Sequence, residues 1–274
     1  MRTMRPSVAV LGIGAMGRAL VSGLLAAGWT PSDISGAVRR ETRRARVEEQ
    51  LSIECHLDAS AAAQGRDVVV VAVKPRDVPG LLESVTASLE PSQVVVSLAA
   101  GVSIDMFETA LPGIPVVRAM PNTPALVGEG VTGLAPGSYV DDLHLQRAVT
   151  VLEAVGSVQV LEENLLDAVT AVSGTGPAYV FLLAEALIEA AIREGLPRDV
   201  AESFVHQTVR GAGHLLTETD EGAADLRAQV TSPGGTTAAA VHVLEERGFR
   251  ALVEDAVRAA AGRSRELGSG GNDE

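Results

Sequence analysis

The sequence predicts an α/β protein in which an N-terminal, doubly wound parallel sheet is followed by a C-terminal region made only of helices. Short apolar, β-branched runs alternate with helical patterns in the first part of the chain, and a glycine-rich turn follows the first of these runs. After about Asn164 the strand pattern disappears and only helical spacing continues. Strands separated by helices indicate βαβ units, and the helices after them indicate a second domain.

Apolar runs of strand length occur in the first part of the chain at residues 7–11, 34–38, 67–73, 93–98 and 115–119. The run DVVVVAV at 67–73 is typical of a strand buried on both faces of a parallel sheet. Helical spacing at 15–27 and 41–50 separates the first runs. Two further candidate strands, 131–135 and 157–161, lie on either side of a predicted helix at 141–154.

Helical patterns fill the second part of the chain, at residues 178–194, 198–216, 237–246 and 250–266. The segment AYVFLLAEALIEAAI in the first of these helices is apolar nearly all round, which predicts deeper burial than an ordinary surface helix has, and packing against another subunit. We therefore expect a dinucleotide-binding domain at residues 1–163, a helical domain at 164–268 and a disordered tail at 269–274.

Composition narrows the class of protein. The 274 residues carry a net charge of −13, which argues against nucleic acid or an anionic membrane as a partner. The unbroken apolar run at residues 68–73 is too short to span a bilayer. Cys55 is the one cysteine, so an internal disulfide and a thiolate metal cluster are excluded. We expect a soluble, cytoplasmic protein without a metal site.

The glycine-rich turn has the spacing of a dinucleotide site. In VAVLGIGAMG, Gly12 permits a tight turn, Gly14 lets the backbone approach a pyrophosphate, and Gly17 lets the helix pack closely on the sheet. The N-terminus of the following helix presents free N–H groups to the phosphates. The expected contacts along this turn are Gly12, Ile13, Gly14, Ala15, Met16 and Gly17.

The end of the second predicted strand indicates which dinucleotide is bound. An NAD site has a carboxylate there for the ribose 2′-OH, whereas an NADP site has a cation. Here Arg39 and Arg40 stand where the acid would be, which favours NADP(H), with NAD(H) left open as a second cofactor. The alternative is a solvated basic start of the next helix.

Other strand ends carry candidate cofactor contacts. Lys74, the one lysine of the chain, ends the buried strand in VAVKP, where ligands bind in such sheets. Ala99 and Ala100 follow the next strand and leave room for a flat ring. Pro121 and Pro124 stiffen a loop that is either a structural turn or a wall of the nicotinamide pocket.

Two turns of the helical part are candidate anion sites. SGTGP at 173–177 leads into a long helix and is as readily a packing turn. TSPGGTT at 231–237 places a pair of glycines and the hydroxyls of Thr236 and Thr237 at the start of a helix, which predicts a cradle for a carboxylate. The alternative is an ordinary N-cap, although a cap needs only one Ser or Thr.

The motifs VAVLGIGAMGRAL, VAVKP, SLAAGV, RAMPNTPALVGEGVTGL, SGTGPAYVF and QVTSPGGTTAAAVHVLE together resemble pyrroline-5-carboxylate reductases, from about residue 7 to Gly268. The resemblance implies a Rossmann domain, a helical domain that joins two subunits, and assembly up to a decamer. It also implies NAD(P)H-dependent reduction of the cyclic imine 1-pyrroline-5-carboxylate to L-proline, the last step of proline biosynthesis.

The same resemblance implies roles for individual residues. Thr237 becomes the hydroxyl nearest the ring nitrogen and is the candidate catalytic residue. The substrate contacts become Ser232, Gly234, Gly235, Thr236 and Glu163. Further cofactor contacts become Ala72, Val73, Lys74, Pro75, Ala99 and Ala100. This chain departs from the family at Asp58, where Asn is common near the adenosine, and at residues 223–225, where a proline is usual.

A cyclic imine can bind already protonated, so the enzyme needs orientation more than a strong acid, which agrees with a turn that contains neither Lys nor His. One alternative is a β-hydroxyacid-type NADP dehydrogenase, which is expected to use a lysine in its helical part; no lysine follows Lys74. A coenzyme F420-type NADP reductase is similar only to the first domain. A nucleotide-sensing dimer without catalysis is the third alternative.

Overall fold

The computed structural model describes residues 5–268, and the expected disordered tail at 269–274 lies outside them. The described chain forms two compact units. The sheet-bearing unit contains residues 5–174 and 260–268, and the helical unit contains residues 175–259. Packing thus places residues 164–174 with the sheet, where Leu166 and Ala171 are fully buried. A domain boundary after residue 163 remains a prediction.

The sheet-bearing unit is built on an eight-stranded sheet with the order β3-β2-β1-β4-β5-β6-β7-β8. Strand β7 runs antiparallel to β6, whereas the other neighbouring pairs are parallel. The expected strands are all present, and β3 is an addition. The strands are β1 Val8–Leu11, β2 Ile34–Ala37, β3 Glu54–His56, β4 Val68–Val71, β5 Val94–Ser97, β6 Val116–Met120, β7 Gly130–Pro136 and β8 Gly156–Val160.

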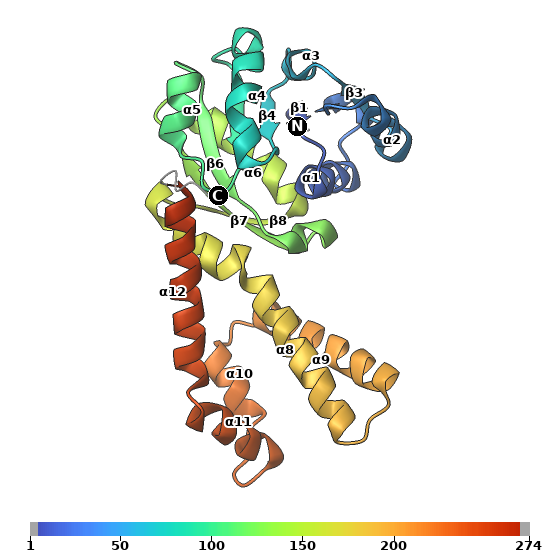
Figure 1. Ribbon diagram of the computed structural model, residues 1–274, viewed down its shortest axis with the longest axis vertical. Coiled ribbons are helices and arrows are strands. Elements are labelled where there is room, and N and C mark those ends of the chain that lie inside the picture. Colours follow the sequence, from blue (N-terminus) through green and yellow to red (C-terminus); the bar gives the residue numbers. More distant parts are fainter. Residues whose placement is uncertain (1–4, 269–274) are drawn as a thin grey trace. The chain divides into compact units, whose positions relative to one another are not determined.

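Helices cover both faces of this sheet (Figure 1). Helices α1, α2 and α6 pack on one face, and α3, α4 and α5 pack on the other. Their bounds are α1 Ala15–Ala26, α2 Glu41–Leu51, α3 Ala59–Ala63, α4 Val78–Val85, α5 Ile104–Ala110 and α6 Asp142–Leu152, and the short α7 Leu166–Val169 follows β8. The sequence patterns predicted α1, α2 and α6, whereas α3, α4 and α5 are additions.

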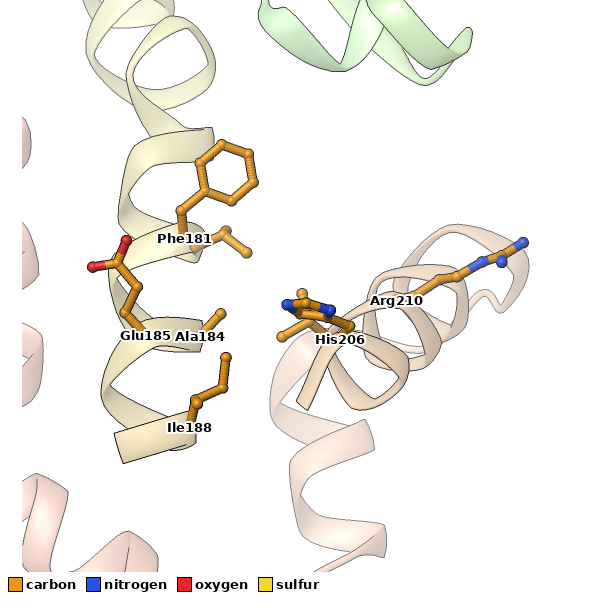
Figure 2. A pocket seen from close by; sticks show the side chains of 8 residues that line it. Phe181, Ala184, Glu185, Ile188, His206 and Arg210 are labelled. Atoms are coloured by element: carbon orange, nitrogen blue, oxygen red, sulfur yellow. The ribbon is translucent and has the colours of Figure 1, made fainter. Parts of the chain in front are cut away.

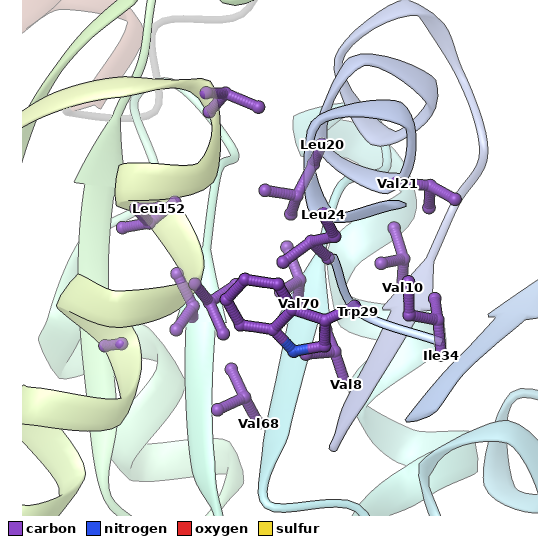
Figure 3. Close-up of a cluster of buried hydrophobic side chains, with 14 of the residues drawn as sticks. Val8, Val10, Leu20, Val21, Leu24, Trp29, Ile34, Val68, Val70 and Leu152 are labelled. Carbon is purple, nitrogen blue, oxygen red and sulfur yellow. The ribbon is translucent and has the colours of Figure 1, made fainter. Parts of the chain in front are cut away.

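The core consists of two layers, one on each face of the sheet. Alternate residues of β1 supply both: Val8 and Val10 face the first layer, and Ala9 and Leu11 face the second. In the first layer the side chain of Trp29 packs among aliphatic residues of α1, α6 and the strands (Figure 3). Its indole N–H donates to the Pro6 carbonyl at 2.9 Å, so this large ring is buried without an unpaired polar atom.

The helical unit consists of α8 Gly176–Arg193, α9 Arg198–Glu218, α10 Ala223–Gln229 and α11 Thr236–Glu246, and it includes the first part of α12 Phe249–Gly268. All but α10 were expected. Helix α8 contains no buried residue, and Phe181 is 61 % exposed. In the single chain α8 is thus exposed except on the side that α9 contacts, and its expected packing against another subunit stays a prediction.

A groove of about 400 Å³ lies between α8 and α9 within this unit. Figure 2 shows Phe181, Ala184 and Ile188 on the side of α8 that faces α9, where His206 lies. The residues that line this groove are mainly apolar, so the groove is a hydrophobic surface of the helical unit.

One helical stretch, Glu163–Arg193, is long and apolar enough to cross a membrane by length and composition alone. Polar and charged residues interrupt this stretch, so its unbroken apolar runs do not reveal it. A single stretch of this kind is weak evidence for a membrane span, and the glycines and Pro177 near its middle separate two segments of different packing.

Candidate functional site

The glycines of the first turn have different structural causes. A Cβ on Gly12 would lie 2.8 Å from Val73 Cγ1, and the φ of Gly12 is +103°, so only glycine fits there. A Cβ on Gly17 would lie 2.2 Å from the Gly12 carbonyl oxygen. A Cβ on Gly14 would meet no protein atom within 4 Å. Packing within the chain requires glycine at positions 12 and 17. No protein atom fills the space beside Gly14, so that space is open to a ligand.

The turn presents main-chain donors rather than side chains. Gly14 is the N-cap of α1, and no side chain caps this helix. The first N–H groups of a helix lack intrahelical acceptors, so they are available to an anion such as a pyrophosphate. Ile13 is buried in the core and could contact a ligand only through its main chain, whereas Ala15 is exposed and Met16 is half-buried. These residues therefore fit the phosphates of a dinucleotide.

The arginines after β2 differ in their partners. The Arg39 guanidinium pairs with Asp77 at 3.1 and 3.3 Å, and its side chain is 81 % exposed. Arg40 is the N-cap residue of α2, and its side chain forms no ion pair within residues 5–268. Arg43, which the sequence analysis did not select, donates from Nη2 to the Ile13 carbonyl at 2.7 Å. Several cations thus lie at the strand end where the ribose substituent is selected.

The ends of β4 and β5 lie beside the glycine turn. Strands β1, β4 and β5 are adjacent and parallel, with Leu11 in register with Val71 and Val71 with Ser97. The candidate contacts that follow β4 and β5 therefore lie at the carboxyl edge, where ligands bind in open α/β sheets. Ala72 and Val73 are half-buried and Ala99 is buried, whereas Lys74, Pro75 and Ala100 are exposed.

The loop after β6 is held by Asn122. Its side-chain amide donates to the Ser173 carbonyl at 3.2 Å, and its oxygen accepts from the Val131 N–H at 3.0 Å. Pro121 is buried and Pro124 is half-buried. These contacts fix the shape of the loop, as both interpretations of it require.

Glu163 takes part in an internal network. Its Oε1 accepts from the Ile104 N–H at 2.9 Å and from Arg118 Nη1 at 2.9 Å. The Arg118 side chain is 14 % exposed. Glu163 thus caps the first turn of α5 and neutralises a half-buried arginine, which gives it a structural role whether or not it contacts a substrate.

The second glycine turn begins α11. Gly235 is the N-cap residue, and no side-chain oxygen caps the helix. The Gly235 N–H donates to the Ser232 carbonyl at 3.0 Å, and a Cβ on Gly235 would lie 2.3 Å from Ser232 Oγ. Gly234 has a φ of +71° and open space around it. The ordinary N-cap alternative is therefore not supported, because the helix start is bare and Thr236 and Thr237 lie within it.

The candidate anion turn at 173–177 has a different structure. Residues Thr170–Gly174 form a π-helical turn that continues from α7, and the Ser173 hydroxyl donates to the Val169 carbonyl at 2.9 Å. The Ala178 N–H donates to the Thr175 carbonyl. These internal hydrogen bonds favour the packing-turn alternative over the anion-turn alternative. Pro177 does lie in the first turn of α8, as predicted.

Sequence reasoning missed three functional candidates: Arg43, Asp77 and Arg118. Each contacts a partner at least 30 residues away in the chain, so no local spacing could reveal the contact. Within residues 5–268 no group of three or more His, Cys, Asp or Glu side chains could hold a metal ion.

Comparison with known proteins gives one consistent result. Residues 163–267 match the family model for pyrroline-5-carboxylate reductase dimerisation, and residues 7–101 match that of coenzyme F420-dependent NADP oxidoreductases. The chain is 45 % identical to the pyrroline-5-carboxylate reductase of Corynebacterium melassecola, covering 96 % of this chain and 98 % of the relative.

Solved structures agree with the sequence comparison. The pyrroline-5-carboxylate reductase of Coxiella burnetii is 39 % identical with a TM-score of 0.92, covering 96 % of this chain and 98 % of that one. The pyrroline carboxylate reductase of Plasmodium falciparum, solved with NADP bound, is 29 % identical with a TM-score of 0.85 and the same coverage. The fold, with its dinucleotide-binding sheet and helical second part, is shared over nearly the whole length. This chain therefore belongs to the pyrroline-5-carboxylate reductase family.

Proposed function

We propose that this protein reduces the cyclic imine 1-pyrroline-5-carboxylate to L-proline with NADPH, the last step of proline biosynthesis. The observation that carries the proposal is the start of α11, a bare helix N-terminus that follows a glycine pair and contains two threonines. A small ligand that carries a carboxylate suits unpaired N–H groups and hydroxyls. The family to which the chain belongs supports the same substrate.

In this proposal each unit has a separate task. The glycine turn and α1 hold the dinucleotide, with Gly12 to Gly17 as its phosphate contacts. The residues after β4 and β5, Ala72 to Pro75 and Ala99 to Ala100, complete its site. In the helical unit, Ser232, Gly234, Gly235 and Thr236 hold the substrate carboxylate. Glu163 stays a candidate substrate contact, beside its structural role.

The chemistry requires orientation more than acid catalysis. The reduced nicotinamide supplies the hydride when it is bound. Thr237 places its hydroxyl beside the ring nitrogen. It either accepts a hydrogen bond from the N–H of an already protonated iminium or donates a proton to the nitrogen of a neutral imine. The fixed carboxylate then prevents the ring from turning, so the reacting carbon keeps one face toward the hydride.

The proposal includes a homodimer, with a decamer as a higher assembly, and a cytoplasmic location. The dimerisation model spans the helical residues, and α8 exposes apolar side chains on several sides, including Val180, Phe181 and Leu182. A second subunit that covers them explains why a helix of this composition is unburied in the single chain.

The test is a comparison of substrates with the purified protein. The absorbance of NADPH is followed in three mixtures: with pyrroline-5-carboxylate, with a ketoacid of the kind that β-hydroxyacid dehydrogenases reduce, and with buffer alone. If the protein oxidises NADPH with pyrroline-5-carboxylate and not with the ketoacid, the proposal is supported. Turnover of the ketoacid favours the β-hydroxyacid alternative, and NADPH binding without any turnover favours a nucleotide sensor.

A further inference from the structure

The salt bridge between Arg39 and Asp77 crosses the proposed nucleotide site. Arg39 follows β2, and Asp77 belongs to a short 3-10 helix, Pro75–Asp77, that follows β4. Strands β2 and β4 are the two neighbours of β1 in the sheet. The pair therefore joins the two sides of the strand from which the glycine turn emerges.

The two partners differ in exposure. The side chain of Arg39 is 81 % exposed, whereas that of Asp77 is 22 % exposed. Asp77 is thus the fixed partner, and the guanidinium is the group that is free to move. Arg39 Nη1 and Nη2 each reach a different oxygen of the Asp77 carboxylate, so the pair uses the donors that would otherwise grip a phosphate.

From this geometry we propose that Asp77 sets the preference between NADPH and NADH by competing with the ribose 2′-phosphate for Arg39. The inference rests on the proposed function, in that a nicotinamide dinucleotide occupies the glycine turn. The ion pair between Arg39 and Asp77 must break before the Arg39 guanidinium can bind a 2′-phosphate. NADH carries a neutral 2′-hydroxyl and leaves the pair as it is.

The competition reduces the affinity for NADPH alone. Only molecules in which Arg39 has left Asp77 can bind the 2′-phosphate fully, and the apparent affinity falls in proportion to their fraction. Removing the negative charge of Asp77 releases Arg39 without removing it. Since the pair is largely exposed, the expected gain is modest, about two- to fivefold in the Kd for NADPH.

The experiment measures the Kd of both nucleotides by calorimetry for the wild type, Asp77→Asn, Arg39→Gln and the double variant, with Asp77→Ala as a second release variant. The expected result is a Kd for NADPH about two- to fivefold lower in Asp77→Asn, with little change for NADH. In the Arg39→Gln background the same substitution is expected to change nothing. Glu83→Gln is the matched control, because it removes one exposed carboxylate from α4 without touching Arg39.

The proposal is overturned if the release variants bind NADPH no more tightly than the wild type does, or if NADH gains equally. It is also overturned if the gain persists in the Arg39→Gln background or appears in Glu83→Gln, because a general change of charge then explains it. A wild-type protein that binds neither nucleotide refutes the proposed function itself, whereas wild-type turnover with unchanged variant affinities refutes only the role of Asp77.

Discussion

Replacing Gly14 and Gly17 in turn by alanine separates a binding glycine from a packing glycine. Gly14 has φ −81° and ψ −155°, which alanine adopts, and its new Cβ would meet no protein atom within 4 Å. Alanine at an N-cap costs about 0.5–1 kcal/mol relative to glycine. The reduced entropy of the unfolded chain offsets about 0.4–1 kcal/mol. The free energy of unfolding should therefore change by less than about 0.5 kcal/mol.

Gly17→Ala has the opposite balance. Its Cβ would lie 2.2 Å from the Gly12 carbonyl oxygen and 3.3 Å from Val10 Cγ1. The first of these is a backbone atom in a constrained turn, so the turn must move. Overpacking of this kind costs about 1–3 kcal/mol. The Tm of a domain this size falls by about 2–4 °C per kcal/mol.

The assay pairs thermal unfolding with NADPH titration. Gly14→Ala should keep the wild-type Tm and bind NADPH at least about tenfold more weakly, a loss of about 1.4 kcal/mol, because a methyl group would occupy the approach of the pyrophosphate. Gly17→Ala should lower the Tm. The reasoning is refuted if Gly14→Ala binds NADPH like the wild type, or if it is as unstable as Gly17→Ala.

The remaining predictions concern the substrate cradle, the Glu163 network and the buried thiol. Thr237→Ala should reduce turnover by at least about tenfold with an unchanged Kd for NADPH, and wild-type turnover would remove Thr237 from the mechanism. Glu163→Gln should lower the free energy of unfolding by about 1–3 kcal/mol, seen as a lower Tm, because Arg118 loses its carboxylate; an unchanged Tm would contradict this. Burial raises the pKa of Cys55 to about 11, above its ordinary value of 9.0, so the stability that depends on its protonated form is complete below pH 9 and is lost between about pH 9 and 11. Thermal unfolding against pH should show this loss in the wild type and not in Cys55→Ala, and identical curves would refute it.

The strands could be predicted from the sequence because buried strands consist mainly of apolar residues. The continuous apolar run at Val68–Val71 lies between two core layers and needs no polar face. The direction of a strand leaves no such trace. Strand β7, GVTGLAP, runs antiparallel to β6, and a pattern of apolar residues cannot reveal that direction. Elements such as α3 and β3 are too short to carry a period.

Those residues of the candidate site that the local backbone geometry requires to be glycine could be predicted from the sequence. Gly12 and Gly17 are required by close contacts that the spacing of the motif already implies. Side chains that act through distant partners were not accessible in this way. Arg39 was selected as a cation, but its pairing with Asp77 joins residues that are 38 positions apart, and only the adjacency of β2, β1 and β4 brings them together.

The exposure of α8 in the single chain agrees with the predicted burial of this helix against another subunit. An amphipathic helix on a protein surface has one apolar stripe, whereas Val180, Phe181, Leu182 and Leu183 are consecutive and each at least 43 % exposed. Consecutive helical residues point about 100° apart, so these four surround the axis and no single neighbour can cover them. Within the helical unit α9 covers one side, and in the proposed dimer the second subunit covers the rest. The apolar composition of α8 thus suits burial in an assembly, and the proposed substrate cradle lies in the same helical unit.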